Sequence, residues 1–240
     1  RRQFLDILLS QLNPSYLSAL QGFNRALKSR NSLLRNRTTD RALLRSFEVP
    51  MAKFGALILF YRQDIVAKML PYIQNFTSDM FPDQQEMSIE LIISAFKEQE
   101  NDPCRIEEKL LLAFEASLKK DIQRQQSHVG PHRDELLINL NGKALNLFGS
   151  DGQCRLASLV LKMTAAQLLI DNQDLDNVVL LIDDVLGELD DKRKESFLKT
   201  ISRGDQVFIA CTEVPEFCRQ NNSQIYTVSN GTIKNTAESE

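Results

Sequence analysis

The stretch Val178–Asp191, VVLLIDDVLGELDD, constrains this chain more than any other part of it. Five consecutive apolar residues, three of them β-branched, predict a strand that is buried on both faces. Two carboxylates, Asp183 and Asp184, follow immediately. Adjacent buried carboxylates are unfavourable unless a cation or a hydrogen-bond donor meets them. Because ligands of open α/β sheets lie at the carboxyl ends of the strands, we expect a ligand here.

A Walker-B-like strand end explains the acidic pair economically. Asp183 would reach Mg²⁺ directly or through water, and Asp184 would orient or deprotonate a water that attacks a γ-phosphate. The dipeptide by itself fits equally well an acidic loop that only caps the next helix.

A second loop, Gly149–Gln153 (GSDGQ), precedes a predicted helix. Backbone N–H groups at a helix start form an anion site together with the macrodipole. Ser150 adds a hydroxyl, and Gly152 lets a phosphate approach the backbone. By itself the loop is more typical of an ordinary helix cap. Its place about thirty residues before the acidic strand, with a second apolar strand ending near Thr212, favours a nucleotide site.

Composition limits the class of protein. With 42% hydrophobic and 25% charged residues, the 240-residue chain is typical of a globular protein of one or two domains. It has neither an apolar run long enough to span a bilayer nor a signal peptide, so we expect a cytoplasmic protein without membrane contact. Its four cysteines form no C-x2-C pair, which disfavours structural zinc.

Charge divides the chain unevenly. Residues 1–70 hold 12 basic and 4 acidic residues, and the remaining 170 residues hold 17 basic and 28 acidic residues. This asymmetry predicts a polyanionic partner such as DNA for the basic half. A solvated helix face is the alternative. The candidate contacts are Arg25, Lys28, Arg30, Arg35, Arg37, Arg41 and Arg45.

The periodicity predicts a helical, basic first half and an α/β second half. Helices are expected over 1–12, 14–37 and 40–76, and Pro50 and Pro71 should kink or break the third. Further helices are expected over 106–126, 154–171 and 191–201. Strands are expected over 87–94, 135–140, 143–148, 178–183, 206–211, 225–228 and 232–233. Asn141-Gly142 is a strong hairpin signal. We expect a domain boundary near residue 85 or 127.

His128 and His132 are four residues apart, but Gly130-Pro131 between them excludes a helical pair of metal ligands. A turn that the second histidine and Arg133 brace is the favoured interpretation. Arg133 would bind either a phosphate or Asp134.

GSDGQ, LLIDDVLGELD and VFIACTE together resemble the C-terminal half of an ABC-type ATPase head. With GPHRDEL at 130–136 and RRQFLD at the start, nearly the whole chain resembles the RecF family of bacterial recombinational-repair ATPases. The resemblance implies an ATPase half over 128–240 and a helical basic arm, or lobe II, over 1–127.

The resemblance also implies roles for the matching residues. The loop of Ser150, Gly152 and Gln153 matches the ABC signature, which contacts ATP held by the other subunit. Asp183 matches the Mg²⁺ residue and Asp184 the catalytic one. Asp190 matches the D-loop residue at the dimer interface, and Thr212 stands where many relatives have a switch His. Asp151 departs from the usual GSQGQ.

Walker A is missing, since no G-x-x-x-x-G-K-[ST] occurs. We therefore expect a fragment that begins after that motif and is inactive alone, from a protein resembling a weak ATPase. The family implies ATP, Mg²⁺, an ATP-dependent homodimer, RecO and RecR partners, and DNA. It would act in repair and replication restart at gaps or single-strand/duplex junctions to help load recombinase. Another SMC- or ABC-type head, or a non-catalytic DNA- or partner-binding fragment, is the alternative.

Overall fold

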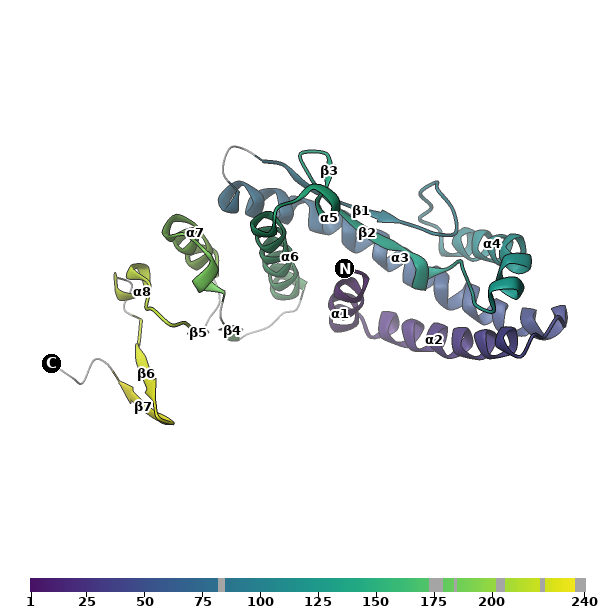
Figure 1. The fold of residues 1–240 in the computed structure, drawn as a ribbon, viewed down its shortest axis with the longest axis horizontal. Helices are drawn as coiled ribbons and strands as arrows, with labels where there is room; N and C mark the ends of the chain where they lie inside the picture. Colours follow the sequence, from purple (N-terminus) through teal and green to yellow (C-terminus); the bar gives the residue numbers. More distant parts are fainter. Residues whose placement is uncertain (82–84, 173–178, 184, 202–205, 221–222, 236–240) are drawn as a thin grey trace. The chain divides into compact units, whose positions relative to one another are not determined.

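The computed structural model describes residues 1–81, 85–172, 179–183, 185–201, 206–220 and 223–235. The chain forms two compact units, unit 1 over Arg1–Asp174 and unit 2 over Leu175–Glu240. Figure 1 labels their helices and strands. The predicted boundary at residue 127 separates an arm from an ATPase half and stays a prediction.

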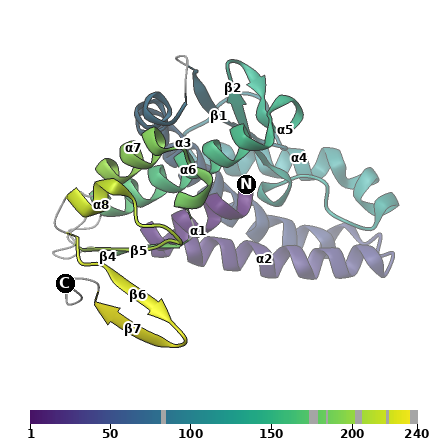
Figure 2. The ribbon, with the colours of Figure 1, turned by 60° about the vertical axis from the view of Figure 1, so that its left-hand side comes forward.

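Four helices build most of unit 1: α1 (Arg2–Leu12), α2 (Pro14–Arg35), α3 (Arg41–Met80) and α4 (Pro103–Arg124). Side chains cap three of their starts. Asn13 accepts hydrogen bonds from the first turn of α2, Asp40 from that of α3, and Asp102 from that of α4. α2 and α4 each begin at a proline, whose missing N–H costs nothing there. Figures 1 and 2 show both helices alongside α3, which they contact.

The predicted break of the third helix is wrong, because α3 runs for 40 residues through both Pro50 and Pro71. An internal proline costs a helix about 3 kcal/mol. Packing offsets this cost, since α3 contacts α2, α4 and α6 and completely buries side chains such as Ile58, Leu59 and Met69.

An antiparallel sheet in the order β1-β2-β3 completes the core of unit 1. Its strands are β1 (Met87–Ile92), β2 (Glu135–Leu140) and β3 (Lys143–Ala144). The predicted turn is present: Asn141 and Gly142 have φ of 50° and 71°, as a type I′ turn requires. The predicted second hairpin strand is shorter than expected. After two residues the chain turns into α5 (Leu145–Phe148), which packs Leu145 into the core and leaves Leu147 and Phe148 exposed.

α6 (Asp151–Asn172) follows and contacts both α1 and α3. It buries an apolar face that includes Val160 and Leu168. No helix among the described residues is long and apolar enough to cross a membrane.

Unit 2 contains a parallel pair of strands, β4 (Val179–Asp183) and β5 (Gln206–Ala210). The other elements are η2 (Leu186–Glu188), α7 (Asp191–Ile201), α8 (Glu216–Gln220), β6 (Tyr226–Ser229) and β7 (Thr232–Asn235). β6 and β7 form the predicted closing hairpin.

The prediction that the first of these strands is buried on both faces is wrong for this chain. Along β4 the side chains alternate between exposed and half-buried, and Leu181 is 78% exposed. β5 shows the same alternation. The apolar run did predict a strand correctly. Its burial depends on what packs against a two-stranded sheet, and a run of sequence does not contain that information.

Candidate nucleotide and nucleic-acid sites

The segment Gly149–Gln153 consists of the two-residue link between α5 and α6 and the first three residues of α6, which begins at Asp151 rather than at the expected residue 154. Its own side chains cap α6. The Ser150 hydroxyl accepts a hydrogen bond from the Gln153 amide at 3.2 Å, and Gln153 Oε1 accepts one from the Ser150 amide at 2.9 Å. This reciprocal pair is a capping box. It orders the start of α6 without using the N–H groups of Asp151 and Gly152, which have no hydrogen-bond acceptor among the described residues.

The same loop is open to solvent. Ser150, Asp151 and Gly152 are all exposed. A methyl group added at Gly152 would meet only the Ser150 hydroxyl, 4.0 Å away, whereas one at Gly149 would lie 2.6 Å from the Leu145 carbonyl oxygen. Gly149 is therefore needed for the turn itself. Nothing inside the unit requires glycine at 152, where an anion or a partner backbone could approach closely.

The acidic strand end lies in unit 2. Asp183 is the last residue of β4, is exposed, and pairs in register with Ala210 of β5. Because the two strands are parallel, Asp183 and the segment leading to Thr212 leave the sheet at the same edge. Asp184 lies outside the described residues. The edge offers an oxygen ligand in the position that α/β folds use for binding.

Asp190 begins α7. Its carboxylate accepts a hydrogen bond from the Arg193 amide at 2.9 Å and also pairs with the Arg193 guanidinium. This is ordinary N-cap geometry. The predicted place of Asp190 at a dimer interface stays a prediction, as do the roles of Thr212 and of the signature loop.

The basic candidates divide into two groups. Arg25, Lys28, Arg35 and Arg37 are exposed on the outer face and end of α2. No ion pair involves any of them among the residues that the structure describes. We call these four cations the α2 outer face.

Arg30 corrects the predicted DNA surface, because its side chain is completely buried. Its guanidinium lies 2.9 Å from Glu48 Oε1 of α3 and 2.8 Å from Asp121 Oδ2 of α4. It also donates to the Ser127 hydroxyl at 2.7 Å. A side chain held in this way cannot reach a phosphate.

Arg41 and Arg45 are engaged as well. Arg41 contacts Glu48 at 2.6 Å and also pairs with Glu115, and Arg45 lies 3.8 Å from Glu115. Few of the basic residues have an acidic residue one helical turn away in the sequence. Arg41 nevertheless finds acidic partners, in Glu48 of α3 and Glu115 of α4. These two arginines therefore carry less available charge than the α2 outer face.

The segment Ser127–Asp134 is tied to the helices by a second cluster, which sequence reasoning missed. Buried Arg62 of α3 bonds to Asp6 at 2.7 Å and to the Pro131 carbonyl at 2.8 Å, and it lies 3.4 Å from Asp134. Desolvation raises the pKa of Asp134, and the Ser94 amide and Arg62 oppose the rise. No short-range pattern links Arg62 to these partners.

The two histidines brace this segment separately. His128 Nδ1 lies 3.0 Å from Asp121, and His132 Nε2 lies 3.1 Å from the Ser127 carbonyl. Arg133 also donates to the Ser127 carbonyl and to Gln126, so it binds its own loop rather than Asp134. Burial lowers the pKa of His132 to about 4, so its ring is neutral at pH 7.

The α/β fold of the chain is of the kind found in part of an ABC-type ATPase. No family model matches the chain. It is 34% identical over 236 residues to the DNA replication and repair protein RecF of Streptococcus gordonii, and 33% identical over 240 residues to that of Clostridium botulinum strain Loch Maree. Each comparison covers 98% of this chain and 64% of the relative.

Solved structures agree. The recombination mediator protein RecF-ATPrS in the RecFOR pathway matches with a TM-score of 0.83 and 28% identity, over 98% of this chain and 62% of that one. The corresponding RecF-ATP structure matches with a TM-score of 0.82. This chain therefore belongs to the RecF family, and it spans slightly less than two thirds of the length of the curated relatives it matches.

Proposed function

We propose that this chain is part of an ATP-dependent DNA-binding protein of recombinational repair and replication restart. The observation that carries the proposal is the match to RecF proteins over 98% of the chain, in sequence and in fold. The protein would act at gaps or single-strand/duplex junctions and help to load recombinase. Its partners would be DNA, RecO- and RecR-type proteins and a second copy of itself.

The exposed loop Gly149–Gln153 would act on ATP in trans. Its capping box leaves the Asp151 and Gly152 amides available, and the Ser150 hydroxyl can still donate to a phosphate oxygen. Asp183 would hold Mg²⁺ at the strand end, and Asp184 would position the attacking water. The 240 residues contain no Gly-rich loop with a Lys for the β- and γ-phosphates. ATP would therefore be gripped by residues other than these.

Estimated binding energies support the assignment of ATP capture to other residues and of ATP recognition to this loop. A helix N-terminus contributes about 0.3–2 kcal/mol toward an anion. A micromolar complex needs roughly 8 kcal/mol. The loop by itself would therefore recognise nucleotide that is already held, rather than capture it from solution.

The test is calorimetric titration of Mg-ATP into the chain alone, and then into the chain mixed with the remaining third of the S. gordonii relative. We expect micromolar binding only in the mixture. Asp183→Asn should weaken Mg-nucleotide binding. Asp184→Asn should keep binding and slow hydrolysis by roughly 100-fold, the usual scale for a lost proton-transfer group. Micromolar binding by the chain alone would contradict the proposal.

The proposed contact of Ser150 with nucleotide in trans can be tested against a control serine on the same helix, α6. Ser150→Ala should lower nucleotide-dependent self-association of the mixture, because the serine would contact nucleotide held by the other subunit. Ser158→Ala removes the hydroxyl of another exposed serine of α6, two turns further on, and should leave association unchanged. Equal effects of both variants would remove the signature role from Ser150.

A non-catalytic DNA-binding role is the second candidate, and the α2 outer face favours it. Arg25, Lys28 and Arg35 fall within one helical face at spacings of three and seven residues, and Arg37 follows the helix end. Such a row of cations would follow a phosphate backbone without reading bases. Hydrolysis by the mixture in the titration above would exclude a purely non-catalytic protein.

A further inference from the structure

β1 is an edge strand, and it leaves one row of backbone hydrogen-bonding groups without a strand partner. The sheet order is β1-β2-β3, and among the described residues only β2 pairs with β1. The Asn141 amide donates to the Glu86 carbonyl at 2.8 Å, which turns the backbone of Glu86 toward β2. Since hydrogen-bonded pairs alternate in antiparallel sheets, Ile89 and Leu91 turn their N–H and C=O groups toward the outer edge.

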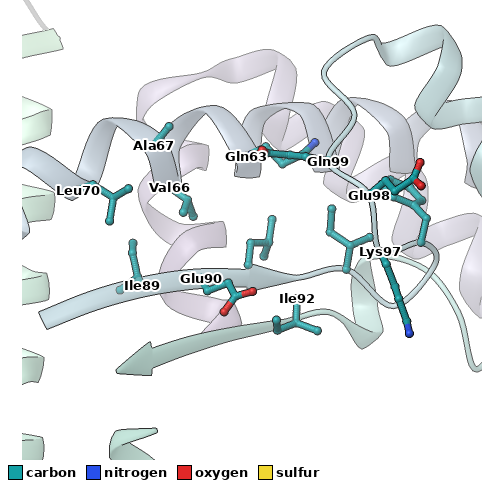
Figure 3. Close-up of a pocket in the computed structure, with 13 residues that line it drawn as sticks. Gln63, Val66, Ala67, Leu70, Ile89, Glu90, Ile92, Lys97, Glu98 and Gln99 are labelled. Atoms are coloured by element: carbon teal, nitrogen blue, oxygen red, sulfur yellow. The ribbon is translucent and has the colours of Figure 1, made fainter. Parts of the chain in front are cut away.

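A groove of about 530 Å³ lies between α3 and this strand, and Figure 3 shows it. We call it the α3–β1 groove. Its lining includes consecutive residues of β1, Ile89 through Ile92. Neighbouring residues of a strand point to opposite faces, so a hollow lined by all of them follows the strand edge rather than one face. The exposed backbone groups therefore border the groove.

Apolar side chains of α3 and β1 line the middle of the groove, and polar contacts hold the loop at one of its ends. Val66 and Leu70 of α3 and Ile89 of β1 face one another across it (Figure 3). At the end of the groove next to the loop that follows β1, the Gln63 side-chain amide donates a hydrogen bond to the Glu100 carbonyl at 2.8 Å and holds this loop against α3. Lys109 strengthens the same loop by pairing with Glu100 at 3.2 Å.

Gln63, which lines the groove, also has a buried polar atom. Gln63 is only 7% exposed, and no group among the described residues donates a hydrogen bond to its buried Oε1 atom.

The charges at the rim select the chemistry of the occupant. Glu90 projects from the middle of β1 and Glu98 lies at the loop end, whereas Lys97 extends away from α3 (Figure 3). No ion pair involves Glu90 or Glu98 in the described part of the chain. A segment that carries basic residues would complement them.

We propose that the α3–β1 groove binds an extended peptide segment of a partner protein, in which apolar residues alternate with basic ones. The segment adds a strand to the outer edge of β1. Its backbone pairs with Ile89 and Leu91, its apolar side chains enter the groove beside Val66 and Leu70, and its basic side chains meet Glu90 and Glu98. This surface uses none of the residues assigned to ATP or DNA.

The probe is an end-blocked octapeptide of alternating Lys and Val carrying a fluorophore, titrated into the 240-residue chain and followed by anisotropy. We expect a Kd on the order of 100 μM, well above that of an evolved partner. The same peptide with alternate amides N-methylated cannot pair with a strand edge and should bind at least tenfold more weakly. Equal binding of both peptides would overturn the strand addition.

Two variants test the location. Ala67 is exposed on α3 and lines the groove, so Ala67→Tyr should fill it and weaken binding at least tenfold. Lys68→Tyr places the same ring on the neighbouring exposed position, outside the groove lining, and should change Kd less than twofold. Leu91→Pro removes an outward N–H, which edge strands tolerate, and should also weaken binding.

Hydrogen exchange supplies a readout that does not depend on the variants. Peptide binding should slow exchange of the Ile89 and Leu91 amides and leave those of β3 unchanged. Glu90→Gln should weaken binding by about two- to fivefold, the scale of an exposed ion pair. Protection of β1 by a single-stranded oligonucleotide in place of the peptide, or no protection by the peptide, would overturn the proposal.

Discussion

The inner and the outer face of α2 both carry basic side chains, but the one on the inner face is buried in ion pairs and those on the outer face are exposed. On the inner face Arg30 is fully buried between Glu48 and Asp121. On the outer face Arg25 and Lys28 are exposed, without an ion pair among the described residues. The difference teaches that a cation in a basic stretch shows its role only when its burial is known.

Distance along the chain explains why the two faces look alike in sequence. The partners of Arg30 lie 18 and 91 residues away, on α3 and α4. A helix-turn pattern cannot reveal them, because only residues three or four apart meet on one helix. The inner face is therefore expected to control stability and the outer face to control binding.

Removing the buried arginine of the inner face of α2 should have the largest effect on stability. Arg30→Met removes the buried guanidinium that pairs with both Glu48 and Asp121, and leaves these buried carboxylates with Arg41 and with His128 and Ser117 respectively. It should lower the free energy of unfolding by about 3–5 kcal/mol, measured by urea denaturation. Adding Glu48→Gln and Asp121→Asn should restore part of the loss, since the buried charges are then gone. A loss below about 1 kcal/mol for Arg30→Met would show that the network is not a determinant of stability.

An intermediate effect is expected from the loop that the inner face supports. Burial holds the pKa of His132 at about 4, against about 6.5 in an unfolded chain. Between these values the unfolded chain binds a proton that the folded chain does not. Stability from this residue is therefore complete above about pH 6.5 and is lost as the pH falls toward 4, by up to about 3 kcal/mol.

Urea denaturation at several pH values checks this expectation. His132→Gln should flatten the profile between pH 6.5 and 4, and the difference from the parent chain cancels contributions of other groups such as Asp134. His128→Gln removes the second histidine of the chain and should keep the steep decline. A profile that stays as steep without His132 would assign the decline to another group.

Substitutions in the α2 outer face should have the smallest effect on stability and a clear effect on DNA binding. Replacing Arg25, Lys28, Arg35 and Arg37 with Ala should change the unfolding free energy by less than about 0.5 kcal/mol per site. If each cation neutralises one phosphate, the log–log salt slope of binding to duplex DNA should fall by about 3 to 4.

A control that removes three cations from another helix sharpens the DNA prediction. Replacing Lys119, Lys120 and Arg124, which are exposed on α4, removes a similar charge from a different helix. The slope should then change by less than about 1. Similar slopes for both sets would indicate attraction by net charge rather than a contact surface on α2.

Local patterns predicted most elements of the chain. Pro14 predicted the start of α2 and Asp40 that of α3, and Asn141-Gly142 predicted the turn between β2 and β3. The expected start of α4 is residue 106, whereas the helix begins at Pro103, one turn earlier. The correctly predicted features depend on residues within a few positions of each other, so the sequence contains the necessary information. The motif resemblance also led to the RecF family, which the comparisons confirm.

Long-range packing decided what local patterns predicted wrongly. α3 continues through Pro50 and Pro71 because its contacts with three helices outweigh the loss at each proline. β4 has the predicted apolar run, yet Leu181 is exposed, since a strand is buried only where something covers its faces.

For the candidate sites, the sequence by itself determined the chemistry that is available: a serine and glycines at a helix start, a carboxylate at a strand end, and a basic helix. Tertiary structure decided which of these groups can meet a ligand. It left the Asp151 and Gly152 amides open and kept Arg25 and Lys28 on the surface. It enclosed Arg30 and Arg62 among carboxylates. The reason is that desolvation and pairing depend on residues brought together by folding, often across 50 or more positions.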